Sequence, residues 1–153
     1  MLSEIYNKRI LALAANLPRA GRLHAPHGSA TAHSKLCGSR VTVDVIMADG
    51  VVADFAQDVK ACALGQASAS ILAQDVIGST LAELTELRDM ARALLKSGGQ
   101  PPAGKWADLE VLLPVRDYKA RHASTLLIFE AVVDAVMQAT ASAQPEPASV
   151  SAA

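Results

Sequence analysis

The alternation of apolar and polar residues over residues 40–59 constrains the fold more than any other feature. Two alternating runs, Val41 to Met47 and Val51 to Val59, flank an Asp49-Gly50 step. Such runs indicate strands with one buried face, and an Asp-Gly step between them indicates a hairpin. We predict a three-residue loop, Ala48–Gly50, with Gly50 left-handed. This register pairs apolar residues with one another: Met47 with Val51, Val45 with Ala53 and Val43 with Phe55.

Helical periodicity accounts for most of the remaining chain. The expected helices span residues 3–15, 63–77, 80–96, 106–113 and 124–139. Ser3, Thr80 and Ser124 are expected N-caps, Thr80 in a capping box with Glu83, and Pro114 is expected to end the fourth helix. Residues 16–36, 97–105 and 115–122 are expected to be loops and connections without regular structure.

This order of elements predicts an α+β domain over residues 1–139. A small antiparallel β-sheet, the hairpin 40–59, should have helices packed on one face and a long C-terminal helix. Residues 140–153 are rich in Ala, Ser and Pro, and we expect them to form a disordered tail.

Composition excludes several classes of protein. The 14 Lys and Arg residues balance 15 Asp and Glu residues, and aromatic residues make up only 3%, which argues against nucleic-acid binding. The sequence shows no apolar stretch of about 18 residues and no secretory signal pattern. With only two cysteines, far apart, a disulfide-rich secreted domain is not expected, and we expect a cytoplasmic protein without membrane contact.

The two cysteines are the main candidates for chemistry. Cys37 precedes the first strand of the hairpin and Cys62 follows the second, so antiparallel pairing should bring both to one end of the sheet. Each taken alone reads more simply as a small buried apolar residue. Together, two thiolates at one place suit zinc or an iron–sulfur cluster. Cys62 also precedes a helix by one or two residues, and a helix N-terminus favours the reactive thiolate.

These features resemble the U-type iron–sulfur cluster assembly scaffolds, the family of IscU, SufU and the NifU N-terminal domain. The resemblance rests on Cys37-Gly38-Ser39, on Cys62 with the small-residue run Gln66 to Ser70 that follows it, and on their spacing of 25 residues. Asn16 to Gly21 is similar to the family's Asn-Pro-Arg-x-x-Gly segment, and Leu112 to Arg116 to its Leu-Pro-Pro-Val-Lys chaperone-binding motif. It implies a SufE/NifU-like fold and a non-enzymatic role in cluster assembly.

The resemblance also implies a site, and this chain departs from it at two positions. The family's Asp ligand corresponds to Ser39, and its third Cys to Ser124, or to Ala123 if the alignment is anchored on the family's His-Cys pair. A neutral hydroxyl is a poor ligand for iron or zinc. The implied metal site is therefore Cys37, Cys62, Ser39 and Ser124, with His122 as a candidate replacement ligand. His33 and Asp117 are weaker candidates.

Three functions remain open at this point. The chain is a scaffold-like protein that binds iron, an iron–sulfur cluster such as [2Fe-2S], or zinc; a persulfide acceptor; or a metal-free interaction protein of the assembly machinery. The resemblance implies a cysteine desulfurase as partner, and an Hsp70-type chaperone at Leu112, Leu113, Pro114, Val115 and Arg116. The chain is expected to be a monomer or a dimer.

Overall fold

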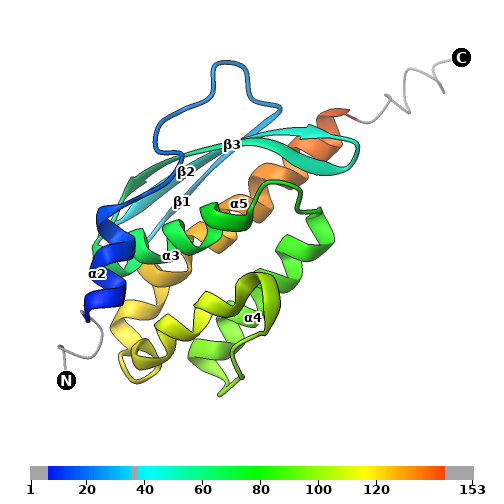
Figure 1. Cartoon of the computed structure of the whole chain (residues 1–153). Helices are drawn as coiled ribbons and strands as arrows, with labels where there is room; N and C mark the ends of the chain where they lie inside the picture. Colours follow the sequence, from blue (N-terminus) through cyan, green and yellow to red (C-terminus); the bar gives the residue numbers. More distant parts are fainter. Residues whose placement is uncertain (1–6, 36–37, 144–153) are drawn as a thin grey trace, which may run out of the picture.

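The computed structural model describes residues 7–35 and 38–143. A three-stranded antiparallel sheet, in the order β1-β2-β3, packs against α-helices (Figure 1). The strands are β1 (Gly28–His33), β2 (Arg40–Ala48) and β3 (Val51–Lys60), and the helices are α2 (Lys8–Ala15), α3 (Ala63–Asp75), α4 (Leu81–Lys96) and α5 (His122–Ala143). Two 3₁₀ segments, η1 (Gly104–Asp117) and η2 (Lys119–Arg121), connect α4 to α5. The α+β class and the long C-terminal helix are confirmed.

The hairpin forms where it was expected, but its loop prediction was wrong. Ala48 pairs with Val51, so the loop has two residues, Asp49 and Gly50. Both have positive φ, 53° and 80°, as a type I′ turn requires. The register then shifts between Ile46 and Met47, leaving Ala53 as the extra residue of a bulge. Because of this bulge Val45 faces Phe55, and the apolar faces still coincide.

Strand β1 was not expected, because residues 16–36 were interpreted as a loop. Gly28–His33 pairs with β2 from Gly28↔Val45 to His33↔Arg40. Its sequence, Gly-Ser-Ala-Thr-Ala-His, lacks the large β-branched residues that usually mark strands. Close packing against α5 explains why a glycine, Gly28, begins this strand. A Cβ there would lie 2.0 Å from the carbonyl oxygen of Ala135, so only glycine lets the strand lie this close to α5.

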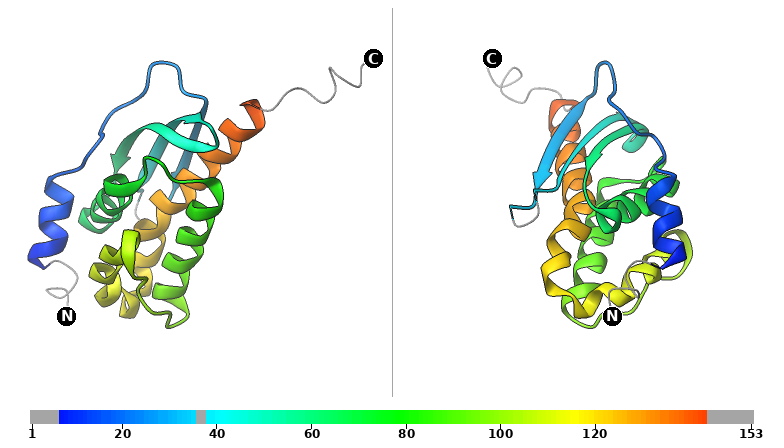
Figure 2. Two further views of the ribbon diagram at one scale, coloured as in Figure 1. Left: turned by 45° about the vertical axis from the view of Figure 1, so that its right-hand side comes forward. Right: turned by 90° about the vertical axis from the view of Figure 1, so that its left-hand side faces the viewer.

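One face of the sheet forms the core with the helices. Val41, Val43, Val45 and Phe55 are buried on this face, against α5 and α3. Helix α4 packs on the other side of α5, so the molecule has a sheet, a middle layer of helices and an outer layer (Figures 1 and 2). The helices therefore cover one face, as the sequence predicted.

Helix α5 is the central element of the core. By length and composition the segment Lys119–Ala141 qualifies as a membrane span, contrary to the expectation that no stretch does. However, 67% of its most apolar window is buried inside the molecule. A helix that is apolar on most sides and surrounded by protein is a core helix. Burial in the core therefore explains why α5 is so hydrophobic.

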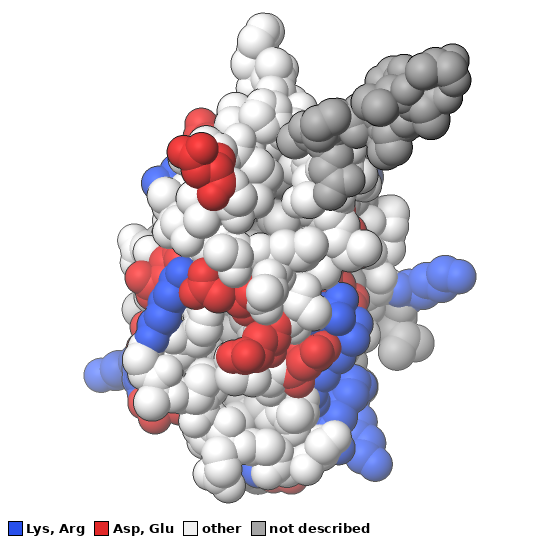
Figure 3. Space-filling model, turned by 90° about the vertical axis from the view of Figure 1, so that its right-hand side faces the viewer, with Lys and Arg blue, Asp and Glu red and all other residues white. Residues whose placement is uncertain are grey.

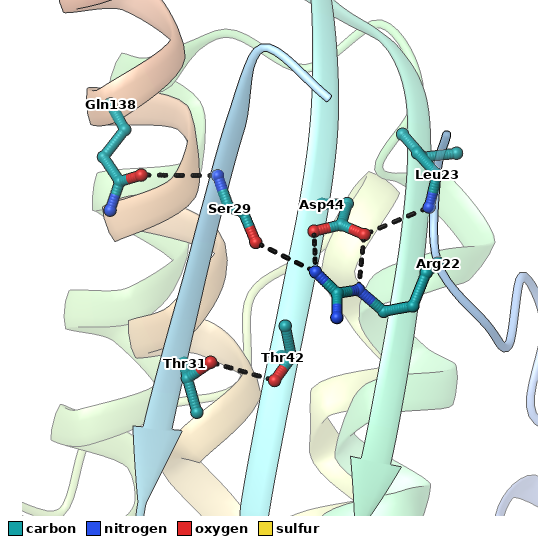
Figure 4. Close-up of polar contacts among 7 residues, drawn as sticks. All are labelled: Arg22, Leu23, Ser29, Thr31, Thr42, Asp44 and Gln138. Carbon is teal, nitrogen blue, oxygen red and sulfur yellow. Dashed lines mark hydrogen bonds and ion pairs between the residues drawn. The ribbon is translucent and has the colours of Figure 1, made fainter. Parts of the chain in front are cut away.

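The opposite face of the sheet carries an ion pair between the buried Asp44 carboxylate and the exposed Arg22 guanidinium. The Asp44 side chain is fully buried, and its carboxylate accepts hydrogen bonds from Arg22 Nε at 2.7 Å, Arg22 Nη2 at 3.1 Å and the Leu23 N–H at 3.0 Å (Figure 4). Burial alone would raise the pKa of Asp44, but the hydrogen bonds from Arg22, Ser29 and Leu23 outweigh it and lower that pKa below its ordinary value. These contacts hold Arg22 and Leu23, which precede β1, against strand β2.

Two helix boundaries differ from expectation, and one agrees with it. Asn7 caps α2, its Oδ1 accepting from the Ile10 N–H at 3.1 Å, while the expected cap Ser3 lies outside the described residues. The capping box of Thr80 and Glu83 is present at α4. Pro114 does not end a helix: it lies inside η1, which continues to Asp117. Proline ends an α-helix because it lacks an N–H donor and its ring clashes with the preceding turn. The segment η1 consists of 3₁₀ turns with a kink at Trp106, so there is no α-helix here for Pro114 to end.

Candidate functional site

The candidate site lies where two helices begin beside one end of the sheet. Cys62 is the N-cap residue of α3, and its side chain makes no capping hydrogen bond. Ser124 lies in the first turn of α5. The Cys62 Sγ and Ser124 Oγ atoms are 3.6 Å apart, within hydrogen-bond range for sulfur. Residues 62 positions apart in sequence are thus neighbours, and Cys62 is partly exposed while Ser124 is buried.

Gly65 makes this close approach possible. A Cβ on Gly65 would lie 2.7 Å from the Ala61 Cβ and 3.1 Å from the Ser124 carbonyl oxygen. Any larger residue would push α3 away from α5 at the point where Cys62 meets Ser124. Gly65 directly precedes the small-residue run Gln66 to Ser70, and no role was expected for it from the sequence. Its signal was a glycine inside a helix, which is unfavourable unless close packing requires it.

Ser124 is not the N-cap that the sequence predicted. Helix α5 begins two residues earlier, at His122. The Ser124 hydroxyl donates instead to the Arg121 carbonyl oxygen at 3.3 Å, a contact that Thr125 Oγ1 also makes at 2.7 Å. The Ser124 hydroxyl is thus held between a backbone carbonyl and the thiol of Cys62.

Ser39, two residues after Cys37, lies at the same end of the sheet as Cys62. Arg40, the first residue of β2, pairs with Lys60, the last residue of β3, two positions before Cys62. Ser39 is buried, and its carbonyl oxygen accepts from the Ser34 N–H at 2.9 Å. Cys37 itself lies outside the described residues. Its approach to Cys62 therefore stays a prediction, which the pairing of Arg40 with Lys60 supports.

His122 has a structural role in this fold. Its ring is buried, and Nε2 donates to the carbonyl oxygens of Val115 at 3.1 Å and Arg116 at 3.0 Å. This nitrogen fastens the end of η1 to the start of α5 and is not available to a metal. His33 is better placed by topology, because it ends β1 and pairs with Arg40 at the site's end of the sheet. Asp117 is exposed at the end of η1.

The donors in the described residues are too few for a resident metal site. Within residues 7–35 and 38–143, no group of three or more His, Cys, Asp or Glu side chains could hold a metal ion. One thiol and one hydroxyl are present at the junction of α3 and α5. Any further thiol ligand from this chain must come from Cys37. The donor set fits a cluster or ion that is bound openly, as transient cargo, better than a closed structural site.

The residues of the expected chaperone motif are only partly accessible. Leu112 and Val115 are fully buried in the core, while Leu113 and Pro114 are half-buried. Arg116 donates from Nε to the Leu94 carbonyl oxygen at 2.7 Å and from Nη2 to the Gly99 carbonyl oxygen. A partner at this segment would contact Leu113 and Pro114 without disturbing the core.

The surface carries both signs of charge. On the face in Figure 3, Asp and Glu side chains gather across the middle, with Lys and Arg towards the margins. Exposed ion pairs such as Arg92 with Glu130 at 3.3 Å contribute little to stability and keep the local charge balanced. This face offers no basic stripe for nucleic acid.

Comparison with known proteins agrees with this geometry. The model of the family "NifU-like N terminal domain" matches residues 5–125. The iron–sulfur cluster assembly scaffold protein IscU of Thermotoga maritima is 27% identical over 100 residues, which are 65% of this chain and 70% of IscU.

Solved structures share the whole fold. The crystal structure of a NifU-like protein (N-terminal) from Brucella abortus is 56% identical, with a TM-score of 0.88, covering 92% of this chain and 97% of that one. The SUF-system protein FiSufU of Fervidobacterium islandicum has a TM-score of 0.80 at 21% identity, covering 88% and 98%, and so supports the fold alone. With a family match over most of its length, the chain belongs to the NifU-like N-terminal domain family of iron–sulfur cluster assembly scaffolds.

Proposed function

We propose that this protein binds iron, an iron–sulfur cluster such as [2Fe-2S], or zinc during cluster assembly, at an open site built on Cys62 and Cys37. Ser124 and Ser39 occupy the positions where the family has its third Cys and its Asp. The observation that carries the proposal is the 3.6 Å distance between Cys62 Sγ and Ser124 Oγ at the junction of α3 and α5. The protein acts as a scaffold and not as an enzyme.

The missing thiol makes the site open. Two thiolates leave a tetrahedral ion two ligands short, and water, His33 or a second protomer would fill the remaining positions. Ser124 contributes a hydroxyl that orients the Cys62 thiol rather than a strong ligand. Cargo held by so few ligands would be released readily, which suits a protein that passes a cluster on.

The partners follow from the family. A cysteine desulfurase would supply sulfur, and an Hsp70-type chaperone would contact the exposed parts of Leu113 and Pro114. We place the protein in the cytoplasm, without nucleic acid or membrane as a partner, as a monomer or a dimer. The balanced surface charge supports a protein partner over a polyanion.

A second candidate function is sulfur transfer through Cys62 alone. Its partial exposure and its unused capping position favour this reading. The Cys62 thiolate would attack the outer sulfur of a desulfurase persulfide. A new S–S bond would form on Cys62, and the desulfurase thiolate would leave as the old S–S bond breaks. A metal-free interaction protein is the third reading.

Anaerobic purification followed by metal analysis tests the proposal. We expect iron or zinc in the wild-type protein and a loss of that metal in the Cys62→Ala variant, with Ser97→Ala as a surface control. Metal-free protein that gains the mass of one sulfur on Cys62 after incubation with desulfurase would instead support the sulfur-carrier reading. Metal-free protein without that mass gain would support the interaction protein.

A further inference from the structure

A separate cavity lies between the end of α4 and the segment that leads into α5. It has a volume of about 340 Å³ and is lined by Leu95, Lys96, Gly98, Arg116, Lys119 and His122. Cys62 and Ser124 are not among these lining residues. The cavity is therefore a second feature of the molecule, independent of the proposed cluster site.

Every charged side chain that lines this cavity is a cation. Lys96 comes from the last turn of α4, Arg116 from η1 and Lys119 from η2. None of the six lining residues is acidic. Among the described residues, neither Lys96 nor Lys119 forms an ion pair or a side-chain hydrogen bond. Like charges brought together without a counter-charge repel one another, so this arrangement favours an anion between them.

The three cations differ in how firmly they are held. The Arg116 guanidinium is fixed by its hydrogen bonds to the carbonyl oxygens of Leu94 and Gly99, and its Nη1 group keeps its own donors. The lysines are exposed and can adjust. A fixed guanidinium beside two adjustable ammonium groups is a suitable arrangement for an oxyanion with more than one negative charge.

The size of the cavity limits the ligand. A volume of about 340 Å³ is at the small end of ligand pockets, and the buried Leu95 forms part of its wall. An extended polyanion would need a longer basic surface than these six residues provide. We infer that the cavity between α4 and the start of α5 binds a small multivalent oxyanion, a phosphate or a di- or tricarboxylate, through Lys96, Arg116 and Lys119.

Titration of the full-length protein with sodium pyrophosphate and, separately, with citrate tests this inference. At low ionic strength we expect saturable binding of at least one anion, with amide NMR shifts at residues 95–98 and 116–122. The Lys96→Gln/Lys119→Gln double variant should bind about tenfold more weakly, because two charge-assisted contacts are lost. The two anions distinguish a phosphate ligand from a carboxylate ligand.

The control is the Lys8→Gln/Lys60→Gln variant, which removes two exposed lysines outside the cavity. It has the same net charge as the test variant and should bind as the wild type does. Thermal unfolding confirms that both variants fold. The inference is overturned if neither anion binds the wild type, if both double variants lose the same affinity, or if the NMR shifts lie elsewhere. Binding of an acidic peptide alone, with neither small anion, would also overturn it.

Discussion

At the scale of single residues, the substitution of serine for the expected third thiol defines the proposed site. Ser124 lies beside Cys62, at the position where the resemblance put the family's third Cys. The sequence alone indicated this position by resemblance, and the structure shows the two side chains in contact. The sequence could not reveal that His122 is committed to backbone carbonyls, because that depends on η1 returning to the start of α5.

Adding a thiol at this position should increase metal retention. The Ser124→Cys variant, with Ser39→Asp, should bind more iron or zinc per chain than the wild type, because a thiolate replaces a neutral hydroxyl beside Cys62. The variant is prepared under reducing, anaerobic conditions to prevent a disulfide, and metal is measured by mass spectrometry. Ser124→Ala with Ser39→Ala is the control. If the folded Ser39→Asp/Ser124→Cys variant binds no more metal than the wild type, this chain has lost metal binding.

Cys62 should react with a small alkylating agent in the native protein. Its thiol is partly exposed at a helix N-terminus and makes no capping hydrogen bond. We expect iodoacetamide to label Cys62 in the Cys37→Ser variant without denaturant, as followed by mass spectrometry at neutral pH. The Cys37→Ser/Cys62→Ser variant sets the background. Labelling that begins only in denaturant would identify Cys62 as a core residue.

Asp44 should make stability depend on pH. Its pKa is lowered in the folded state, so its contribution is present above the unfolded-state pKa and is lost as pH falls through the folded-state pKa. Asp44→Asn should lower the free energy of unfolding by about 2 kcal/mol at pH 7, since Arg22 loses its charged partner. The difference from the wild type should shrink in acid, as measured by urea unfolding.

Asp54→Asn is the matched control for that experiment. Asp54 forms an exposed pair with Arg19 at 3.5 Å, and such pairs contribute under about 1 kcal/mol. A pH-independent loss of stability in Asp44→Asn, or an equal loss in both variants, would contradict the role given to the pair of Arg22 with the buried Asp44.

At the scale of elements, the sequence predicted the helices and strands that have a periodic apolar pattern. It missed the strand that forms only through tertiary contacts. The hairpin, α3 and α4 follow patterns visible in the chain, including the capping box at Thr80. Strand β1 has little intrinsic strand preference and forms because β2 and α5 lie beside it. A two-residue turn followed by a bulge between Ile46 and Met47 also keeps apolar residues opposite one another. The pattern of apolar residues alone therefore could not decide the length of the loop.

Gly65 tests the contact between α3 and α5. In a helix interior, alanine in place of glycine usually stabilises by about 1 kcal/mol. Here the added methyl group would meet Ala61 and Ser124, so we expect Gly65→Ala to destabilise the protein by about 1–3 kcal/mol. It should also reduce metal retention. Gln74→Ala, exposed on the same helix, should stay within about 0.5 kcal/mol of the wild type. A more stable Gly65→Ala variant would contradict the close approach.

At the scale of the whole molecule, α5 joins the core, the sheet and the proposed site in one element. Its first turn holds Ser124, and its later turns pack on β1, where the Gln138 side chain accepts from the Ser29 N–H at 3.3 Å. The helix extends four residues beyond the predicted end at 139, to Ala143. The boundary between the domain and a C-terminal tail stays a prediction.

Two truncations test that boundary. Ending the chain after Ala143 should leave the thermal unfolding midpoint unchanged, because the packing contacts of α5 are kept. Ending it after Met137 removes Gln138 and the fully buried Ala139 and should lower the midpoint measurably. A large loss of stability in the variant that ends after Ala143 would show that residues 144–153 belong to the folded domain.

In the proposed function, Cys62 and its neighbours hold an iron–sulfur cluster only until it is passed on. The most direct measurement is the iron and acid-labile sulfide bound per chain after anaerobic reconstitution, together with the visible absorption spectrum. We expect a cluster spectrum for the wild type, a stronger and longer-lived one for Ser39→Asp/Ser124→Cys, and none for Cys62→Ala. Equal iron and sulfide in the wild type and in Cys62→Ala, or no cluster in any of the three folded proteins, would contradict it.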